Sequence, residues 1–308
     1  MVFNRFRFKL ISAFAVIYFV WGSTFLGIRL ALESLPPFLL AGIRFFLAGI
    51  IMIVWARLKS HHAPSKRQVL QAVISGFFMI FVGHGCLTWA EQFIPSGMAA
   101  LIIATIPIWM IFFEWLQKRE NLHWMTWVGI PIGLLGVYLL TDIDQSVLIR
   151  TGSNISVFKG VLFLTAAAVS WGFGSIYSRR IDHALSLRWV VGIQMCAAGL
   201  GLLVMGTMNG EWERLAGSDI SSTSLIAMLY LVFMGSILAY SSYMWLLQVS
   251  SPTKVGTYAY FNPVVAIIFG ALFAEEVITI PMILGGILIL ISLFMVNLSK
   301  HSDFKVNK

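Results

Sequence analysis

The chain has 308 residues, of which 59% are hydrophobic and only 11% are charged, where roughly a quarter is usual for soluble domains. This composition excludes a soluble globular domain and predicts an all-α integral membrane protein. The formal net charge of +8 comes from basic residues in the loops between apolar runs, and it does not indicate a nucleic-acid partner.

Apolar runs of about 20 residues recur along the chain, each long enough to cross roughly 30 Å of hydrocarbon as a helix. We expect ten transmembrane helices, at residues 10–31, 37–57, 69–90, 96–116, 123–141, 158–179, 187–208, 225–247, 253–273 and 280–299. The first run follows Arg5, Arg7 and Lys9, as in a signal peptide. It is too long for one and no small-x-small cleavage site follows it, so we expect it to remain as the first span.

Two stretches of the chain carry similar sequences in the same order. WGSTFLGIRL and AGIRFFLAG in the first half correspond to WGFGSIYSRR and VGIQMCAAG, 150 residues further on. The matching positions are Trp21 with Trp171, Ala41 with Val191, Pro107 with Pro263 and Glu120 with Glu276. We predict two five-helix repeats, at 10–141 and 158–299. Because five is an odd number of spans, the second repeat is inverted relative to the first.

The basic residues are distributed unevenly between the two sides of the predicted membrane. With the N-terminus inside, sixteen lie in inner loops and only Arg150, Lys159 and Arg214 lie in outer loops. The positive-inside rule therefore predicts that both termini are cytoplasmic. The short loops indicate a bacterial inner membrane. Cys86 and Cys196 lie inside spans, and no nucleotide-binding or metal-ligand spacing occurs, so we expect no cofactor and no metal.

Polar and aromatic side chains recur at helical spacing on several spans, for example His84 and Thr88 on the third, Tyr240 and Tyr243 on the eighth, and Tyr258 and Asn262 on the ninth. A polar face is costly in lipid, so we predict a wet central cavity formed by spans 1, 3, 4, 6, 8 and 9. The candidate substrate-binding residues are Trp21, Arg44, His84, Thr88, Trp89, Pro107, Trp171, Ser175, Gln194, Tyr240, Tyr243, Trp245, Tyr258 and Asn262. Helix packing without substrate contact is the alternative for each. Aromatic walls suit an amphipathic or aromatic solute, or a cation held over a ring face.

Pro107 and Pro263 lie in mid-span, where each removes a backbone donor and frees a carbonyl that must face protein or water. A kink set by packing is the alternative. Glu120 and Glu276 each precede a final span, and we expect a structural role in which the carboxylate caps the N-terminus of that helix.

Two buried ionisable residues have two interpretations each. Arg44 either snorkels outward to Glu33 or Glu91, or faces the cavity and pairs with a substrate carboxylate. His84, in the middle of the third span, is either a hydrogen-bonded structural histidine or a proton-coupling group.

In the order, spacing and duplication of its motifs the chain resembles the drug/metabolite transporter superfamily, in the ten-span branch with two EamA domains. The residues that carry the resemblance are WGSTF from Trp21, AGIRF from Ala41, SGMAALIIATIPIW from Ser96, FNPVVAIIFGALFAEE from Phe261 and the LGGILILISLFMV run that follows. Known members move small solutes, often outward, including amino acids, their derivatives and toxic metabolites. The resemblance implies a small-molecule substrate and the same six cavity-forming spans.

Two functions remain open at this point. The first is a secondary transporter that exports a small organic solute by alternating access, with protons as a candidate coupling partner. The second is an integral membrane enzyme that acts on a lipid-linked substrate. An enzyme needs clustered catalytic groups, which the short loops do not contain, and only transport explains an inverted repeat. The substrate, the coupling ion and the oligomeric state are left open by the sequence.

Overall fold

A computed structural model of the chain describes residues 2–59, 63–118, 124–140, 154–182 and 184–306, and every regular element in these ranges is a helix. The first half contains α1 (Val2–Ala31), α2 (Pro37–Lys59), α3 (Lys66–Gly76), η1 (Phe77–His84), α4 (Gly85–Ala90), α5 (Ser96–Ile103), α6 (Ile106–Lys118) and α7 (Trp124–Leu139). The second half contains α9 (Asn154–Ser178), α10 (Leu187–Met208), α11 (Glu211–Ala216), α12 (Ser222–Tyr230), η2 (Leu231–Tyr240), α13 (Ser241–Val249), α14 (Pro252–Val255), α15 (Tyr258–Phe273) and α16 (Ile280–Val306).

Seven stretches of helix in the described residues are long and apolar enough to cross a membrane, and three shorter apolar helices accompany them. The seven are Arg5–Ala31, Pro37–Lys59, Lys66–Ala90, Ser96–Gln117, Val157–Ser178, Leu187–Met208 and Ser222–Val249, and the three are Trp124–Leu139, Tyr258–Phe273 and Ile280–Val296. Each of the ten corresponds to one of the expected spans. Only helices satisfy their own backbone in lipid, which is why the apolar runs fold in this way.

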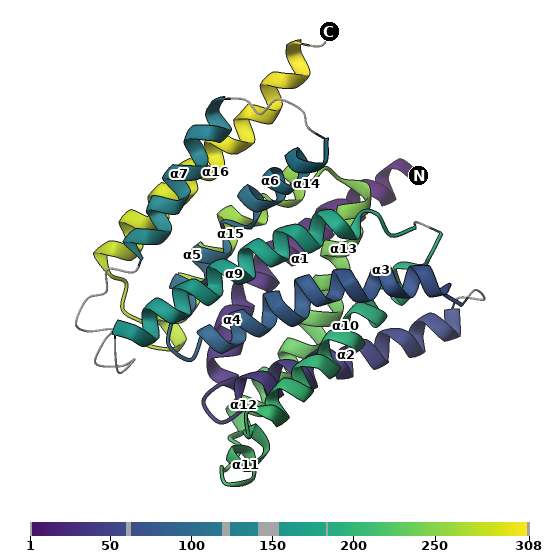
Figure 1. The fold of residues 1–308 in the computed structure, drawn as a ribbon, viewed down its shortest axis with the longest axis vertical. Coiled ribbons are helices and arrows are strands. Elements are labelled where there is room, and N and C mark those ends of the chain that lie inside the picture. The colour runs from purple at the N-terminus through teal and green to yellow at the C-terminus, as the bar shows by residue number, and fades with distance from the viewer. Residues whose placement is uncertain (1, 60–62, 119–123, 141–153, 183, 307–308) are drawn as a thin grey trace.

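Corresponding helices of the two halves run in opposite directions, as α1 and α9, α2 and α10, and α7 and α16 do in Figure 1. The contacts follow the same relation. α2 packs along α10 and α7 along α16, so each of these helices meets its own counterpart. α1 packs on α15 and α12 just as α9 packs on α6 and η1. The two repeats therefore form one bundle around a pseudo-twofold axis.

The contact between α2 and α10 depends on glycines at corresponding positions. A Cβ atom on Gly49 would lie 2.6 Å from the backbone nitrogen of Cys196, and one on Gly199 would lie 2.5 Å from that of Phe46. Small residues of this kind let two membrane helices approach at backbone distance, where dispersion attraction is strongest. The glycines of AGIRFFLAG and VGIQMCAAG thus hold the two repeats together.

Two spans contain π-helical stretches, η1 and η2, which end at His84 and Tyr240, 156 residues apart. π-helical turns interrupt the regular helical spacing and often occur at functional sites. The expected polar stripes on the third and eighth spans assumed an uninterrupted α-helix. Side chains on either side of η1 and η2 are therefore rotated relative to that expectation.

Two further spans are broken, one in its middle between α5 and α6 and one a single turn from its start between α14 and α15. At each break a threonine donates to a carbonyl three residues earlier, Thr105 Oγ1 to Ile102 at 2.7 Å and Thr257 Oγ1 to Lys254 at 2.6 Å. Pro107 is the second residue of α6, so the donor it lacks falls in a first turn that needs none. Contrary to the expectation, Pro107 therefore does not free a carbonyl inside a continuous helix, whereas Pro263 does lie inside α15.

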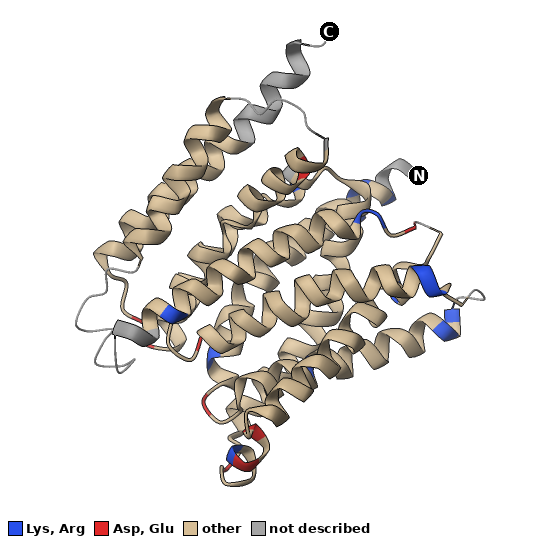
Figure 2. Ribbon diagram, viewed as in Figure 1, with Lys and Arg blue, Asp and Glu red and all other residues tan. Residues whose placement is uncertain are grey.

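Charged residues separate to the two ends of the bundle (Figure 2). Basic residues gather at the end that holds the N-terminus, which we call the basic end. Acidic residues gather at the opposite end, around α11, which we call the acidic end. This separation agrees with the positive-inside pattern, and the cytoplasmic location of the termini stays a prediction.

At the acidic end, carboxylates cap helices of the other repeat. Glu276 accepts from the backbone nitrogen and hydroxyl of Ser96 at 2.7 and 2.9 Å, and from the nitrogen of Gly97 at 3.2 Å. It therefore caps α5, and the expectation that it caps the final span is wrong, because the chain between α15 and α16 turns its carboxylate toward the first repeat. Glu120 lies outside the described residues.

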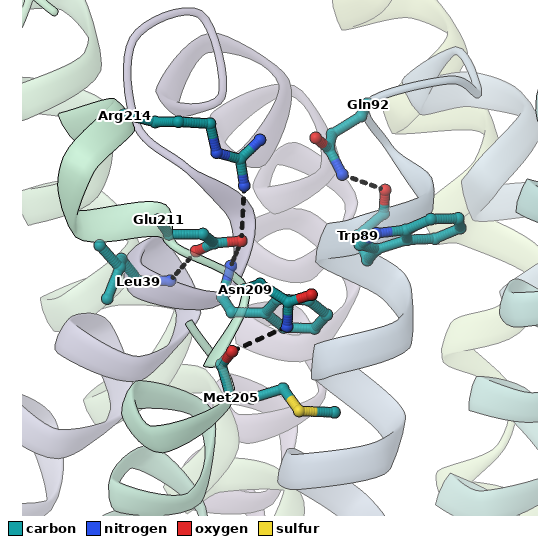
Figure 3. Close-up of polar contacts among 8 residues, drawn as sticks. Leu39, Trp89, Gln92, Met205, Asn209, Glu211 and Arg214 are labelled. Atoms are coloured by element: carbon teal, nitrogen blue, oxygen red, sulfur yellow. Dashed lines mark hydrogen bonds and ion pairs between the residues drawn. The ribbon is translucent and has the colours of Figure 1, made fainter. Parts of the chain in front are cut away.

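Glu211 has the same role at α2, where its carboxylate accepts from the backbone nitrogen of Leu39 at 2.8 Å (Figure 3). Arg214 adds an ion pair with Glu211 at 3.3 Å. A carboxylate at a helix N-terminus satisfies donors that the helix leaves free and interacts favourably with the helix dipole. Both caps join the two repeats.

Glu276→Gln is expected to lower the stability of the protein by about 2 kcal/mol, because a neutral amide loses charge-assisted hydrogen bonds and turns donors toward donors. Thermal unfolding of the purified protein in detergent measures this. Glu213→Gln is the matched control, since Glu213 is exposed at the same end. Equal unfolding temperatures for the two variants would contradict the capping role.

Candidate functional site

A cavity lies between the repeats, at the level of the helix breaks and the end of η1. It is lined by Trp21, Thr24, Phe25, Gly83, His84, Leu87, Ile103, Ile106, Ala167, Trp171, Tyr258 and Asn262. The space between these side chains measures about 440 Å³, including any part open to the outside. Trp21 and Trp171 keep only 7% and 6% of their surface exposed, so these two rings are buried where they line the cavity.

Aromatic rings form a layer on the side of the cavity that faces the basic end. Trp21 and Trp171, which correspond in the two repeats, meet edge to face with ring centroids 5.6 Å apart. The ring of Tyr243 lies 4.9 Å from Trp21, 5.6 Å from Trp171 and 5.9 Å from Tyr258. Tyr243 is fully buried. We call these four side chains the aromatic layer, and it lies between the cavity and the basic end.

Hydrogen bonds hold the aromatic layer in place. Trp171 Nε1 donates to the Tyr243 hydroxyl at 3.1 Å, and this hydroxyl also bonds with Ser175 Oγ at 2.7 Å. Behind the layer, the Tyr240 hydroxyl donates to Gln194 Oε1 at 3.0 Å, and Gln194 Nε2 donates to Ser75 Oγ at 2.9 Å. The hydrogen bonds of four residues therefore support the cavity wall from behind: Ser175, Tyr240, Tyr243 and Gln194.

Three polar side chains of the cavity wall differ in whether they already have a hydrogen-bond partner. With its amide oriented to face acceptors, Asn262 donates to the carbonyls of Ile17 at 3.1 Å and Tyr18 at 2.9 Å. His84 Nδ1 and the Tyr258 hydroxyl have no hydrogen-bond partner among the described residues. Buried polar groups normally have one, so these two are the groups that can bond with a solute.

Five of the candidate residues line the cavity: Trp21, His84, Trp171, Tyr258 and Asn262. His84 packs against the ring of Trp171 at 5.2 Å and that of Phe45 at 4.8 Å. Its neighbour in the predicted stripe, Thr88, is buried but does not line the cavity. Pro107 packs beside the break in the ninth span, where a Cβ on Gly256 would lie 2.9 Å from the proline Cβ.

Arg44 takes neither of its two expected positions. It is 2% exposed, so it does not snorkel, and it is not among the cavity-lining residues. Its Nε donates to Ser236 Oγ at 2.8 Å, and its guanidinium lies over the ring of Phe45 at 4.6 Å. The eighth span and an aromatic ring of α2 thus provide partners that hold Arg44 behind the cavity.

Trp89 and Trp245 correspond in the two repeats, and both lie away from the cavity lining. Trp89 is half-buried and packs on Phe163 with ring centroids 4.3 Å apart, while its carbonyl accepts from Gln92 (Figure 3). Trp245 lies at the basic end, with Lys9 Nζ 4.4 Å from its ring centroid. Their assignment to the cavity is corrected, because each stacks on a neighbouring helix instead.

Sequence reasoning missed the apolar part of the wall, which comprises Phe25, Gly83, Leu87, Ile103, Ile106 and Ala167, and also the polar Thr24. Thr24 follows Trp21 by three positions and Leu87 follows His84 by three, so helical spacing from the polar candidates points to both. The isoleucines and the alanine carry no local signal, because apolar residues face lipid and protein alike in a membrane helix.

Comparison with known proteins shows which family the chain matches. The model of the EamA-like transporter family matches this chain twice, at residues 9–142 and 158–298. The chain belongs to the EamA-like transporter family. This membership decides between the two functions left open by the sequence: the protein is a membrane transporter and not an enzyme.

Relatives in this family align over most of their length. The inner membrane transporter YedA of Escherichia coli (strain K12) is 37% identical over 270 residues, which cover 86% of this chain and 84% of that protein. The transporter YvbV of Bacillus subtilis (strain 168) is 26% identical over 292 residues, covering 94% and 92%. A crystal structure with 18% identity has a TM-score of 0.64 over 95% of this chain and 98% of its own, which supports the fold alone. This EamA-like transporter is a multi-pass protein of the inner membrane.

Proposed function

We propose that the protein exports a small organic solute, such as an amino acid, a metabolite or a drug-like compound, by alternating access around the cavity. One observation carries this proposal. The cavity lies where two broken spans, one from each oppositely oriented repeat, come together: Ile103 and Ile106 flank the first break, and Tyr258 begins the helix after the second. Discontinuous helices at the interface of inverted repeats are typical of substrate sites in secondary transporters.

The inverted repeat explains how one cavity serves both sides of the membrane. Two copies of one design in opposite orientations can each adopt the conformation of the other, and this exchange moves the opening of the cavity from one side to the other. The aromatic layer closes the basic side in the present conformation. Its two tryptophans come from different repeats, so relative movement of the repeats separates them.

The lining favours an uncharged or amphipathic solute with a flat apolar part. Trp21, Phe25 and Trp171 offer ring faces and edges, and no Asp, Glu, Lys or Arg is among the residues that line the cavity in the described part of the chain. The Tyr258 hydroxyl and His84 Nδ1 are free to orient a polar end of the solute. A few placed polar groups in an apolar wall provide orientation and specificity.

Export, as opposed to import, is proposed from the resemblance to transporters that often move solutes outward. A resistance screen with amino acids, metabolites and drugs in cells that overproduce the protein identifies candidates. Efflux of a labelled candidate from proteoliposomes then tests movement directly. Solute that crosses the membrane chemically unchanged supports the proposal, and selective uptake in place of efflux contradicts the outward direction.

Tyr258→Phe and Asn262→Ala are expected to impair transport by different routes. Tyr258→Phe removes only the free hydroxyl, so transport falls about tenfold at most while stability is kept. Asn262→Ala also removes the bond between α15 and α1, so stability falls by about 1 to 2 kcal/mol as well. Efflux and thermal unfolding of both variants, beside Gln248→Ala at an exposed position, test this. Unchanged transport in both variants would count against the cavity as the substrate site.

A further inference from the structure

Glu91 is a buried carboxylate whose two oxygens have no hydrogen-bond partner among the described residues. It follows α4 directly, and its backbone nitrogen donates to Leu87, which lines the cavity, at 3.1 Å. Its side chain lies one helical turn beyond the cavity toward the acidic end and is 0% exposed.

The charged groups that the structure describes around Glu91 bind other partners or are exposed, and none of them binds its carboxylate. From α1, Arg29 Nη1 donates to the backbone carbonyl of Glu91 at 3.2 Å and not to its carboxylate. From α2, Arg44 is bound to Ser236. Between α15 and α16, Glu276 is a like charge that caps α5. On α9, Lys159 is exposed.

On the span that precedes Glu91, the titratable groups toward the cavity are Cys86 and His84, and His84 packs against Trp171. In the part of the chain that the structure describes, no cation reaches ion-pair distance of the Glu91 carboxylate, although Arg29 and Arg44 are close enough to act on it electrostatically.

The two repeats differ at this position. The sequence WAEQ from Trp89 corresponds to WLLQ from Trp245, so Leu247 stands where the first repeat has Glu91. Leu247 is buried as well. The fold therefore accepts an apolar residue at this place in the repeat, and the carboxylate is not needed for packing. An acid retained in a buried, unpaired position is costly, which indicates a functional role.

Protonation of the Glu91 carboxylate removes most of the free-energy cost of burying its charge. Burial raises the pKa of the Glu91 carboxyl well above its usual range, Glu276 raises it further, and Arg29 and Arg44 act in the opposite direction. When the acidic end opens, water reaches the carboxylate and the ionised form becomes favourable again. Closure and proton binding at Glu91 therefore favour each other.

We propose that Glu91 is a proton-binding site whose protonation closes the acidic end of the cavity. The proton comes from the aqueous phase on that side, joins the carboxylate as the end closes, and leaves when it opens. The site would thus link proton binding to the conformational cycle. This inference rests on the alternating access proposed above.

The direction of the pH dependence follows from the two conformations. The closed conformation has the higher pKa at Glu91, so it is most favoured below the usual carboxyl pKa and loses this advantage as pH rises toward the raised value. Each unit of difference between the two pKa values changes the ratio of closed to open about tenfold. Glu91→Gln, which cannot ionise, should stay closed at every pH.

Two measurements on the full-length protein in lipid bilayers test the proposal without a known substrate. Infrared spectroscopy at about pH 7 reports protonated carboxyl groups. We expect a band that Glu91→Gln removes and that Glu33→Gln, an exposed control, leaves intact. The second measurement, in proteoliposomes, is the rate at which a membrane-impermeant thiol reagent added only on the side of the acidic end labels a cysteine placed at Ile103 in the cavity, with Cys86 and Cys196 replaced by alanine.

Because the thiol itself reacts faster as pH rises, each rate is divided by that of a cysteine placed at the exposed Ser218 of the same variant at the same pH. This relative rate is expected to rise about tenfold or more from about pH 5 to about pH 9, to stay low and flat in Glu91→Gln, and to remain pH-dependent in Glu91→Asp. Glu91→Asp keeps an ionisable group and serves if the glutamine variant does not fold. A carboxyl band unaffected by Glu91→Gln, a flat profile in the parent, or a pH response that persists in Glu91→Gln would each overturn the proposal. Neither measurement involves solute movement, so a failed efflux assay is a separate result that counts against the proposed transport function.

Discussion

Gly199→Leu is expected to prevent the two repeats from packing, with almost no monodisperse protein recovered in detergent. A Cβ atom at Gly199 already lies 2.5 Å from the backbone nitrogen and 2.9 Å from the Cα of Phe46. These are backbone atoms of α2, which cannot move aside as a side chain can. Relief requires α2 and α10 to separate along their length, where Gly49 makes the corresponding contact with Cys196. Overpacking of a single site costs about 1–3 kcal/mol, and separation of a whole interface costs more.

Val204→Phe is the matched control for this variant. Val204 lies on the same helix and is 57% exposed, so added bulk there meets lipid. Size-exclusion chromatography of fluorescent fusions measures the folded fraction of both variants. Equal recovery of Gly199→Leu and Val204→Phe would show that the contact between α2 and α10 is not what joins the repeats.

Trp171→Ala is expected to reduce transport at least tenfold. Trp171 lines the cavity, belongs to the aromatic layer and donates to Tyr243, so its removal opens the seal toward the basic end. Replacement of a packed Trp by Ala costs about 3–5 kcal/mol. A free-energy difference of about 1.4 kcal/mol, a fraction of that cost, changes an equilibrium constant tenfold. The change shifts the balance between the closed and open sides and also removes a wall of the substrate site.

Trp89→Ala removes the same atoms from a tryptophan outside the cavity lining and should leave transport close to that of the parent protein. Efflux from proteoliposomes, normalised to the amount of folded protein, compares the two variants. A similar loss in both would mean that membrane-helix tryptophans matter here only for folding. A loss confined to Trp171→Ala would support the cavity as the path of the solute.

The helices and their pairing into repeats follow from local features of the sequence. Each apolar run must form a helix in lipid, because no water is present to bond with its backbone. The recurrence of the motifs at Trp21 and Trp171 relates the two halves. Five spans per half then require opposite orientations, and α1 and α9 do run in opposite directions (Figure 1).

The cavity was predictable only in part. Trp21, Trp171, Tyr258 and Asn262 were found because polar and aromatic side chains are costly in lipid and repeat on one helical face. Trp89 shows the same local features, yet packs on Phe163 of another span. Local spacing shows that a side chain avoids lipid, but it does not show whether protein or cavity replaces the lipid.

What the sequence determined by itself is the membrane class, the helices, the two repeats and the family, because each depends on composition or on similarity along the chain. Tertiary structure alone decided that Arg44 is bound to Ser236, that Glu276 caps α5 and that Glu91 is buried without a partner. The partners of these side chains are set by contacts between helices far apart in sequence. The free energy of a buried charge depends on those contacts and not on the residue itself.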